Sequence, residues 1–331
     1  MSFKRTLLKT TYKLGVFNPF HWANRANVLI LTYHRFSPSK EAYRVSSSEF
    51  SAHLEYLRRH NNVVSLSKAV RNLTSGEPLP PNTVVITIDD GYRDAFDVAL
   101  PTLKKFGLPA TLFVITDFLD GRCWLWTDLL RYVFLNTRLD SIDLELTDGE
   151  RIRAELQDRA QRIEVANRIN SHLKRLPNRE KDESIEQIAH ELGVSIPSSP
   201  TAEYAPISWE QAHEMEANNL QIESHTVSHP ILTNIDEPDL DFELQASKER
   251  LEAVLNKEVQ HFCYPNGAVD DSVRRSVEKA GYKSAVTTAY GFNKGHVDRF
   301  LLNRIDGQAE IEKFAQSVSG FELTKQKLQM N

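Results

Sequence analysis

The stretch Val84-Val85-Ile86-Thr87-Ile88-Asp89-Asp90-Gly91 places two adjacent carboxylates directly after a run of apolar and β-branched residues. Such a run is typical of a strand buried in a parallel sheet. A second stretch, His225-Thr226-Val227-Ser228-His229, follows another predicted strand at 220–223. Its two imidazoles are four residues apart, a spacing that brings both onto one face of a helical turn. Both stretches therefore set polar groups at the ends of predicted strands.

Together the two stretches supply the ligands of a hydrolytic metal site. Two imidazole nitrogens and one carboxylate leave a coordination position open for water. A second carboxylate beside the metal is a ready general base. Two adjacent charged carboxylates also repel each other, so a cation is needed to keep both ionised in a confined site. The pattern predicts a hydrolase with one divalent ion; zinc is preferred, and cobalt, nickel or iron also suit these ligands.

The composition excludes several other classes of protein. The chain has 331 residues, of which 40% are hydrophobic and 26% charged, as in ordinary globular proteins. Its net charge of -5 argues against nucleic acid as the main partner. Cys123 and Cys263 provide no disulfide framework, so we expect free thiols and a cytoplasmic protein. No stretch approaches the roughly 20 apolar residues of a transmembrane helix, and lysines interrupt any signal-peptide core.

Residues 1–26 form a basic N-terminal segment ahead of the predicted barrel at 27–331. No Asp or Glu precedes Glu41, whereas seven basic residues do: Lys4, Arg5, Lys9, Lys13, Arg25, Arg35 and Lys40. Phe17, Phe20 and Trp22 add apolar surface to this segment. Two interpretations remain open. The segment either makes a peripheral contact with the inner face of an anionic membrane, or it packs on the domain with its lysines in solvent.

Apolar runs alternate with helical patterns along most of the chain, which predicts βα units and a parallel sheet. The predicted strands are Val28 to Tyr33, Val84 to Ile88, Ala110 to Ile115, Leu220 to Glu223, His261 to Tyr264, Ser284 to Thr287 and Phe300 to Asn303. We expect an α/β barrel with its catalytic groups at the carboxyl ends of the strands. His34, Asp89-Asp90, His225 and Tyr264-Pro265-Asn266-Gly267 all follow strands, so they should share one rim.

The region from about 117 to 205 interrupts this alternation and predicts a helical insertion after the third strand. Apolar residues recur there at helical spacing, at Ile152, Leu156, Ala160, Ile163, Ala166, Ile169, Leu173 and Leu176. A second helix is expected over 183–192, ended by Gly193. The insertion should form a lid or wall over the site, or an interaction surface. Trp124, Trp126 and Tyr204 could stack on the rings of a bound substrate, or belong to its core.

Three motifs resemble those of a known family. Thr87-Ile88-Asp89-Asp90-Gly91, His225 to Pro230 and Phe262-Cys263-Tyr264-Pro265-Asn266-Gly267 resemble the first three motifs of the NodB-type polysaccharide deacetylases, carbohydrate esterase family four. The resemblance implies a distorted (β/α)7 barrel related to the TIM barrel, and metal-dependent removal of an N- or O-acetyl group from a sugar. It implies that Asp89 is the base that activates metal-bound water, with Asp90, His225 and His229 as metal ligands. The backbone N–H of Asn266, beside Tyr264 and Pro265, would help hold the oxyanion.

The chain departs from the family pattern at two places. Many members carry an arginine in motif three to orient the base, whereas this chain has Cys263; Arg304 could supply a guanidinium from a neighbouring strand, or be an ordinary surface residue. The late Leu-x-x-His motif, which supplies the general acid in many members, is missing. Leu31-Thr32-Tyr33-His34-Arg35 resembles the N-terminal Tyr-His motif of exopolysaccharide and poly-N-acetylglucosamine deacetylases, in which this histidine is taken as the acid. A structural histidine bonded to a loop carbonyl is the alternative.

The leading hypothesis is thus a deacetylase acting on an N-acetylated sugar of a cell-surface polysaccharide or its precursor. A deformylase or deacetylase of a lipid-linked aminosugar is the enzymatic alternative, which the basic N-terminus favours. A glycan-binding protein without catalysis is the alternative from another class. The four intact motif residues argue against it, and the missing motif-three arginine supports it. The sequence makes no prediction about the oligomeric state.

Overall fold

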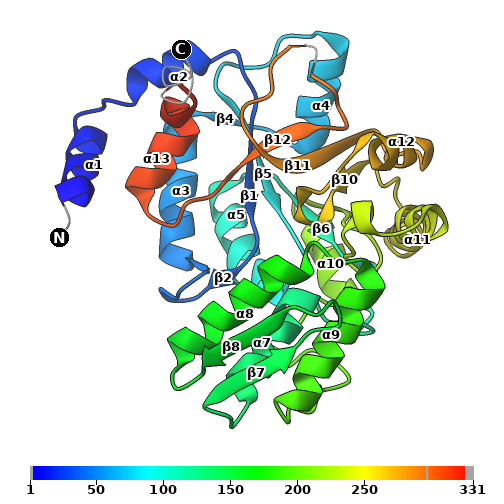
Figure 1. Ribbon diagram of the computed structural model, residues 1–331. Coiled ribbons are helices and arrows are strands. Elements are labelled where there is room, and N and C mark those ends of the chain that lie inside the picture. The colour runs from blue at the N-terminus through cyan, green and yellow to red at the C-terminus, as the bar shows by residue number, and fades with distance from the viewer. Residues whose placement is uncertain (1–2, 296, 325–331) are drawn as a thin grey trace.

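Seven parallel strands close into a barrel in the computed structural model, which describes residues 3–295 and 297–324 (Figure 1). The strands follow one another around the barrel in chain order, and the last pairs with the first through Leu31 and Ile305. They are β1 (Leu29–Tyr33), β5 (Thr83–Ile88), β6 (Ala110–Val114), β9 (Leu220–Ser224), β10 (His261–Cys263), β11 (Ser284–Tyr290) and β12 (Leu302–Asp306). The predicted distorted (β/α)7 barrel is confirmed.

The last strand is shifted along the chain from its predicted position. It was expected to begin at Phe300, but β12 begins at Leu302. Asp298 is the physical reason, because its carboxylate accepts from the Phe300 N–H and its carbonyl accepts from the Leu301 N–H, which holds this stretch in a turn. The shift places Arg304 inside the strand and not after it. Its side chain is buried at 2% exposure.

Alternation along the strands divides the barrel interior into an apolar layer and a polar layer. Ile30, Val85 and Leu302 belong to one buried apolar cluster, which α4 (Leu66–Ser75) closes from the amino end of the barrel. Two residues further along the same strands are Thr32, Thr87 and Arg304, which point the same way because side chains alternate with a period of two. The polar side chains therefore gather toward the carboxyl ends of the strands.

The outer helices bury the other face of the strands in the main hydrophobic cluster. They are α3 (Ser47–His60), α5 (Leu100–Phe106), α10 (Trp209–Glu216), α11 (Glu237–Leu255), α12 (Asp271–Lys279) and α13 (Ile311–Ser319). Capping boxes begin α3, through Ser46 and Glu49, and α10, through Ser208 and Gln211. Short strands β2 (Phe36–Ser37) and β3 (Val45–Ser46) pair beside the first strand's end, and β4 (Asn62–Val63) pairs with β5.

The insertion between β6 and β9 contains a β-hairpin as well as helices, so the purely helical prediction is wrong for residues 141–155. Its elements are α6 (Thr116–Leu119), α7 (Trp126–Asn136), β7 (Ser141–Glu145), β8 (Arg151–Glu155), α8 (Arg159–Leu173) and α9 (Asn178–Glu191). Ile152 lies in β8, where alternate residues are buried. The helix starts only after Asp158, whose side chain caps it by accepting from the Gln161 N–H. The apolar residues of the hairpin alternate with a period of two, and some of them also fit the spacing expected of a helix.

The insertion lies at the carboxyl end of the barrel strands (Figure 1). It has a hydrophobic cluster of its own, which also contains Ile231, two residues beyond His229. Asn234 donates to the carbonyl oxygens of Lys174 and Leu176 in the insertion. The segment that follows the paired histidines is therefore packed against the insertion.

The N-terminal segment forms two helices, α1 (Phe3–Lys13) and α2 (Asn18–Asn24), at the edge of the molecule (Figure 1). Both contact α13. Phe17 is buried, and Leu8 and Tyr12 pack against the main cluster. None of the helices in the described part of the chain combines the length and the apolar content that crossing a bilayer requires.

Candidate active site

Asp89 and Asp90 directly follow β5 and are both buried, at 2% and 7% exposure. The Asp89 N–H donates to the Tyr33 carbonyl and so continues the β1–β5 ladder by one residue. Asp90 then adopts a left-handed φ of 78° and Gly91 one of 89°. A Cβ at Gly91 would meet Leu119 and Val114 at 3.0–3.1 Å, so only glycine fits this turn comfortably. The turn aims the two adjacent carboxylates in different directions.

Backbone strain is concentrated in the three motifs. Among the described residues, eight other than glycine have a positive φ, and four of them are Asp90, Thr226, His229 and Asn266. Left-handed backbone is costly for such residues and is found where the surrounding structure enforces it, often at functional sites. Thr226 is the most strained of the four, because a β-branched residue rarely adopts a positive φ, whereas Asp, His and Asn tolerate it better.

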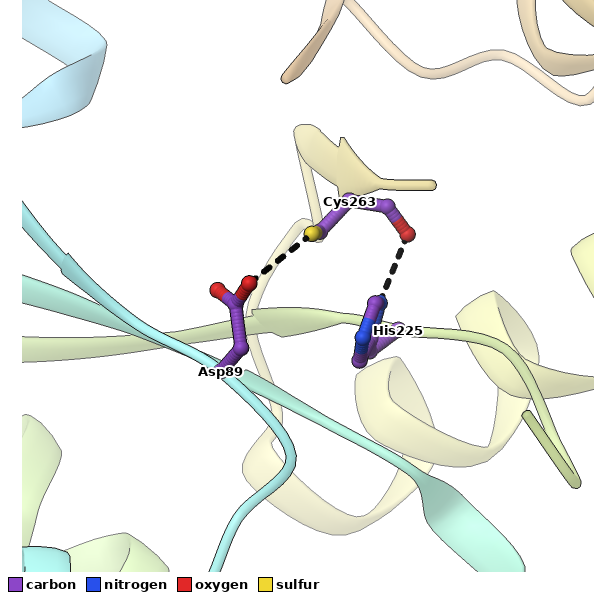
Figure 2. Close-up of side chains that lie close together, drawn as sticks. All are labelled: Asp89, His225 and Cys263. Carbon is purple, nitrogen blue, oxygen red and sulfur yellow. Dashed lines mark hydrogen bonds between the residues drawn. The ribbon is translucent and has the colours of Figure 1, made fainter. Parts of the chain in front are cut away.

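Asp89 is held by Arg304, which reaches it from β12. The guanidinium donates from Nη1 to Oδ1 and from Nη2 to Oδ2, each at 2.7 Å. The Thr32 hydroxyl lies 3.4 Å from Oδ2. The Cys263 sulfur lies 3.5 Å from the same oxygen (Figure 2). Burial alone would raise the pKa of Asp89, but the charge and hydrogen bonds of Arg304 lower it well below its usual range. The Asp89 carboxylate is therefore ionised and free of other strong donors.

Asp90, His225 and His229 converge on one point beside that ion pair. The Nε2 atoms of His225 and His229 lie 3.5 and 3.8 Å from Asp90 Oδ1, and the three ligand atoms are all within 4.8 Å of one another. Ligands of a tetrahedral ion at about 2.1 Å are separated by roughly 3.4 Å, so this set fits one divalent ion with small adjustments. All three residues are buried.

Hydrogen bonding orients the first imidazole for this role. His225 Nδ1 lies 2.7 Å from the Cys263 carbonyl and donates to it, which leaves Nε2 toward Asp90 (Figure 2). Burial by itself would lower the pKa of His225, but Cys263 and Asp90 raise it well above its ordinary value. Burial lowers the pKa of His229 to about 3, which keeps that ring neutral. A proton on His225 and a bound cation are alternative ways to balance Asp90, since metal binding displaces ligand protons.

A second possible ligand set, Asp89, His225 and Cys263, fits a cation less well. Arg304 already neutralises Asp89, and its Nη2 lies 3.2 Å from the Cys263 sulfur. A metal there would face a guanidinium at close range. Burial also raises the pKa of the Cys263 thiol, whereas a metal ligand must be a thiolate. We therefore take Asp90, His225 and His229 as the candidate metal ligands.

Glu243 supports the loop that carries the two histidines, a role that the sequence analysis missed. Its Oε2 accepts from the Val227 and Ser228 N–H groups at 2.7 and 3.0 Å, and its Oε1 accepts from the Ser228 hydroxyl. Within the loop, the Thr226 hydroxyl accepts from the His229 N–H at 2.9 Å. Glu243 is buried on α11 beside Leu244. The signal available in the sequence was a carboxylate directly before Leu244, within leucines at 240, 244 and 251 whose spacing indicates a helix.

His34 lies at the same rim. Its Nε2 is 3.7 Å from Asp89 Oδ2, and its side chain is half-exposed. This position after β1 combines contact with the candidate base and access for a substrate. A structural histidine bonded to a loop carbonyl was the alternative, and the described residues provide no such bond. The structure thus brings together His34, Arg304, Asp89, Asp90, His225 and His229.

Motif three forms a tight turn after β10. Pro265–Gly267 make a single helical turn in which Asn266 has a φ of 54°. A Cβ at Gly267 would meet the Thr288 hydroxyl at 2.0 Å, so this position requires glycine. The Tyr264 hydroxyl and the Asn266 side-chain nitrogen are buried without a hydrogen-bond partner among the described residues. The turn joins the rim through Cys263, which contacts Asp89, His225 and Arg304.

Two of the three aromatic residues considered for sugar stacking belong to the protein core. Trp126 is buried in the hydrophobic cluster of the insertion, and Tyr204 is 3% exposed. Trp124 is partly exposed, donates to the Pro197 carbonyl, and packs against the rings of Tyr132 and Tyr204. Of the two alternatives, a place in the core is therefore the one that holds for Trp126 and Tyr204, because protein covers the faces of both rings.

Comparison with known proteins identifies the family. The model of the polysaccharide deacetylase family matches residues 76–197 and 199–285, more than half of the chain. The chain belongs to the polysaccharide deacetylase family, and it is a hydrolase of the deacetylase type. YxkH of Bacillus subtilis strain 168, whose name assigns it to the polysaccharide deacetylases, is 24% identical over 283 residues, which cover 85% of this chain and 71% of that protein.

A second relative aligns over a shorter region. The poly-β-1,6-N-acetyl-D-glucosamine N-deacetylase of Staphylococcus aureus strain MSSA476 is 33% identical over 99 residues, 29% of this chain and 34% of that protein. Among solved structures, the deacetylase PplD of Streptococcus pyogenes has a TM-score of 0.60 at 19% identity, covering 89% of this chain and 99% of that one. IcaB from Ammonifex degensii has a TM-score of 0.57 at 18% identity, covering 88% and 97%. These structures share the fold.

Proposed function

We propose that this protein removes the N-acetyl group from an N-acetylated sugar of a cell-surface polysaccharide or its precursor, with a divalent metal ion held by Asp90, His225 and His229. The observation that carries the proposal is the arrangement of Asp89. Its carboxylate is ionised by Arg304 and lies beside three converging ligand atoms. A base, a cation site and a half-exposed histidine on one rim are the parts that amide hydrolysis needs.

The roles of the residues follow from their positions. A bound divalent ion supplies an acidified water and polarises the acetyl carbonyl. Asp89 accepts a proton from the attacking water, because Arg304 keeps it ionised. His34 gives a proton to the departing nitrogen, since it is the histidine of this rim that is not a candidate ligand. The backbone N–H of Asn266 hydrogen-bonds the oxyanion of the tetrahedral intermediate.

Two observations bear on the substrate. A relative named for action on poly-β-1,6-N-acetyl-D-glucosamine aligns with part of the chain, which favours an N-acetylglucosamine polymer. The exposed basic N-terminal segment favours a lipid-linked aminosugar instead, with an acetyl or formyl group as the part removed. Zinc is the preferred ion because the ligand set is two imidazoles and a carboxylate.

The test is release of the acyl group from a defined panel. The purified protein is incubated with poly-N-acetylglucosamine oligomers and with lipid-linked N-acyl aminosugars, and acetate and formate are measured. We expect acetate from the oligomers, loss of activity on chelation, and recovery with Zn²⁺ or Co²⁺. Elemental analysis of the protein before and after chelation measures the metal independently of activity. Glycan binding without release of acid would instead support a binding protein.

A further inference from the structure

We propose that the N-terminal face, defined as α1, α2 and the link between them, docks on the surface of an anionic lipid bilayer. The proposal is independent of the catalytic assignment. Among the described residues nine large hydrophobic side chains are exposed, and four of them, Leu7, Leu14, Val16 and Trp22, lie within residues 7–22. Single exposed apolar side chains are ordinary, but such a concentration marks an interaction surface.

Two of these side chains, Leu7 and Val16, line an apolar groove. It has a volume of about 420 Å³, with Phe17 and Phe321 among its other lining residues. Both helices rest on α13, and the ring of Phe20 packs edge-on against Phe321 at 4.9 Å between centroids. The groove therefore has a packed floor while its rim is exposed, a geometry that accepts acyl chains or apolar side chains from outside.

The basic side chains of the N-terminal face indicate which kind of surface it binds. Lys9, Lys13 and Arg25 have no carboxylate within 4.0 Å among the described residues, whereas Arg5 pairs with Glu310 at 3.1 Å. No acidic residue occurs in the first forty positions to offset them. Cations without a close carboxylate partner, beside exposed apolar groups, match a bilayer with anionic headgroups. In a symmetric dimer through this face, the same cations of two copies would come together and repel.

The aromatic residue of the face fits a headgroup layer. Trp22 is 67% exposed, and the Arg25 guanidinium lies 4.1 Å from its ring centroid. Tryptophan and arginine side chains with an apolar body and a polar end are favoured at the boundary between lipid and water. Since none of the described helices is able to span a bilayer, the contact is peripheral.

The test is co-sedimentation of the full chain with vesicles. We expect binding to phosphatidylglycerol–phosphatidylcholine vesicles, little binding to pure phosphatidylcholine, and release at about 1 M salt, where the Debye length is about 3 Å. Leu7→Ser with Leu14→Ser should weaken binding by about tenfold or more. Leu139→Ser, at a residue exposed by 46% in the insertion, is the matched control and should bind as the parent does.

A charge series completes the test. Lys9→Gln with Lys13→Gln should weaken binding by about fivefold for each lysine. Lys104→Gln with Lys105→Gln, which removes two exposed lysines from α5, should leave it unchanged. Equal binding to neutral vesicles, or equal losses in the control variants, would overturn the proposal. So would a concentration-dependent dimer that Leu7→Ser with Leu14→Ser abolishes, because the second copy would then be the occupant.

Discussion

Arg304 of β12 and Asp89 after β5 form a two-point ion pair across the inside of the barrel, although 215 positions separate them in the chain. The remaining donors of the guanidinium are also used. Nε donates to the Thr287 carbonyl, Nη1 also reaches the Thr87 hydroxyl, and Nη2 also reaches the Cys263 sulfur. The small thiol at position 263 leaves space for this guanidinium. Arg304 thus supplies the positive charge that motif three itself lacks.

Removing that charge should shift the pH dependence of activity. In Arg304→Met, the main group that opposes the effect of burial is lost, so the pKa of Asp89 rises. The base is then protonated at higher pH, and the acidic limb of the pH–rate profile should move upward. The lowered pKa also stabilises the fold above the unfolded value of about 3.9, and this stabilisation is lost as the pH falls toward the folded value. A pH–rate profile and a denaturant titration measure the two effects.

A second variant distinguishes the lost charge from a damaged fold. An unpaired buried carboxylate costs roughly 3–5 kcal/mol, so Arg304→Met is expected to be less stable. Adding Cys263→Arg to Arg304→Met returns a guanidinium to the same space from β10. This double variant should move the acidic limb back toward that of the parent. If the profile of Arg304→Met matched the parent's, the assignment of Arg304 as the partner of the base would be wrong.

Asp89 and Asp90 should respond differently to the same chemical change. Asp89→Asn should retain the metal ion and lose at least about 10²-fold in turnover, the contribution typical of a general base. Asp90→Asn should instead weaken metal binding, since its Oδ1 faces both imidazoles. Isothermal titration with Zn²⁺ and turnover measured at saturating metal separate the two. An empty site in Asp89→Asn with a filled one in Asp90→Asn would reverse the roles.

His34 should affect turnover without affecting metal affinity. His34→Ala removes the proposed proton donor, so we expect turnover to fall by about 10²-fold and the alkaline limb of the pH–rate profile to disappear. Its Nε2 contacts Asp89 and not the ligands, so the Zn²⁺ affinity should stay within the error of the parent's. A substrate with a more acidic leaving nitrogen should recover part of the rate. No recovery with such a substrate would contradict the acid role.

The order of the strands and the position of the rim could be predicted from the sequence because both depend on local patterns. Continuous apolar runs mark strands buried on both faces, and polar residues directly after them mark strand ends. Phe300 was misplaced because an apolar residue in a turn looks like the start of a strand. Only the Asp298 side chain, which accepts from the backbone there, makes the difference. The two residues are only two positions apart, so Asp298 was a local turn signal that the apolar pattern outweighed.

The insertion shows what could not be predicted from the sequence, because its structure depends on contacts between distant residues. Ile152 and Leu156 fit a helical spacing by chance, while the alternation of Ile142, Leu144 and Ile152 marks the hairpin that forms. Short segments satisfy both periods, and the pairing that decides between them involves a partner strand. Long-range partners explain Glu243 as well. Its role depends on a loop fifteen residues away, which only the packing of α11 brings into contact.

Glu243 should control metal affinity without touching the metal. It holds the Val227 and Ser228 N–H groups and thereby fixes a loop in which Thr226 and His229 have strained backbone. Glu243→Gln keeps the shape of the side chain but turns one acceptor into a donor, so the loop should loosen. Partners that orient metal ligands are typically worth 10–100-fold in affinity, and we expect a loss of that order for Zn²⁺. Competition with a chromophoric chelator measures this affinity.

Glu249→Gln, at an exposed position on the same helix, is the matched control and should bind Zn²⁺ as the parent does. The Co²⁺ absorption spectrum of Glu243→Gln should also change at saturating metal, because the His229 ring is no longer fixed. An unchanged affinity and spectrum would show that the loop holds its shape without Glu243.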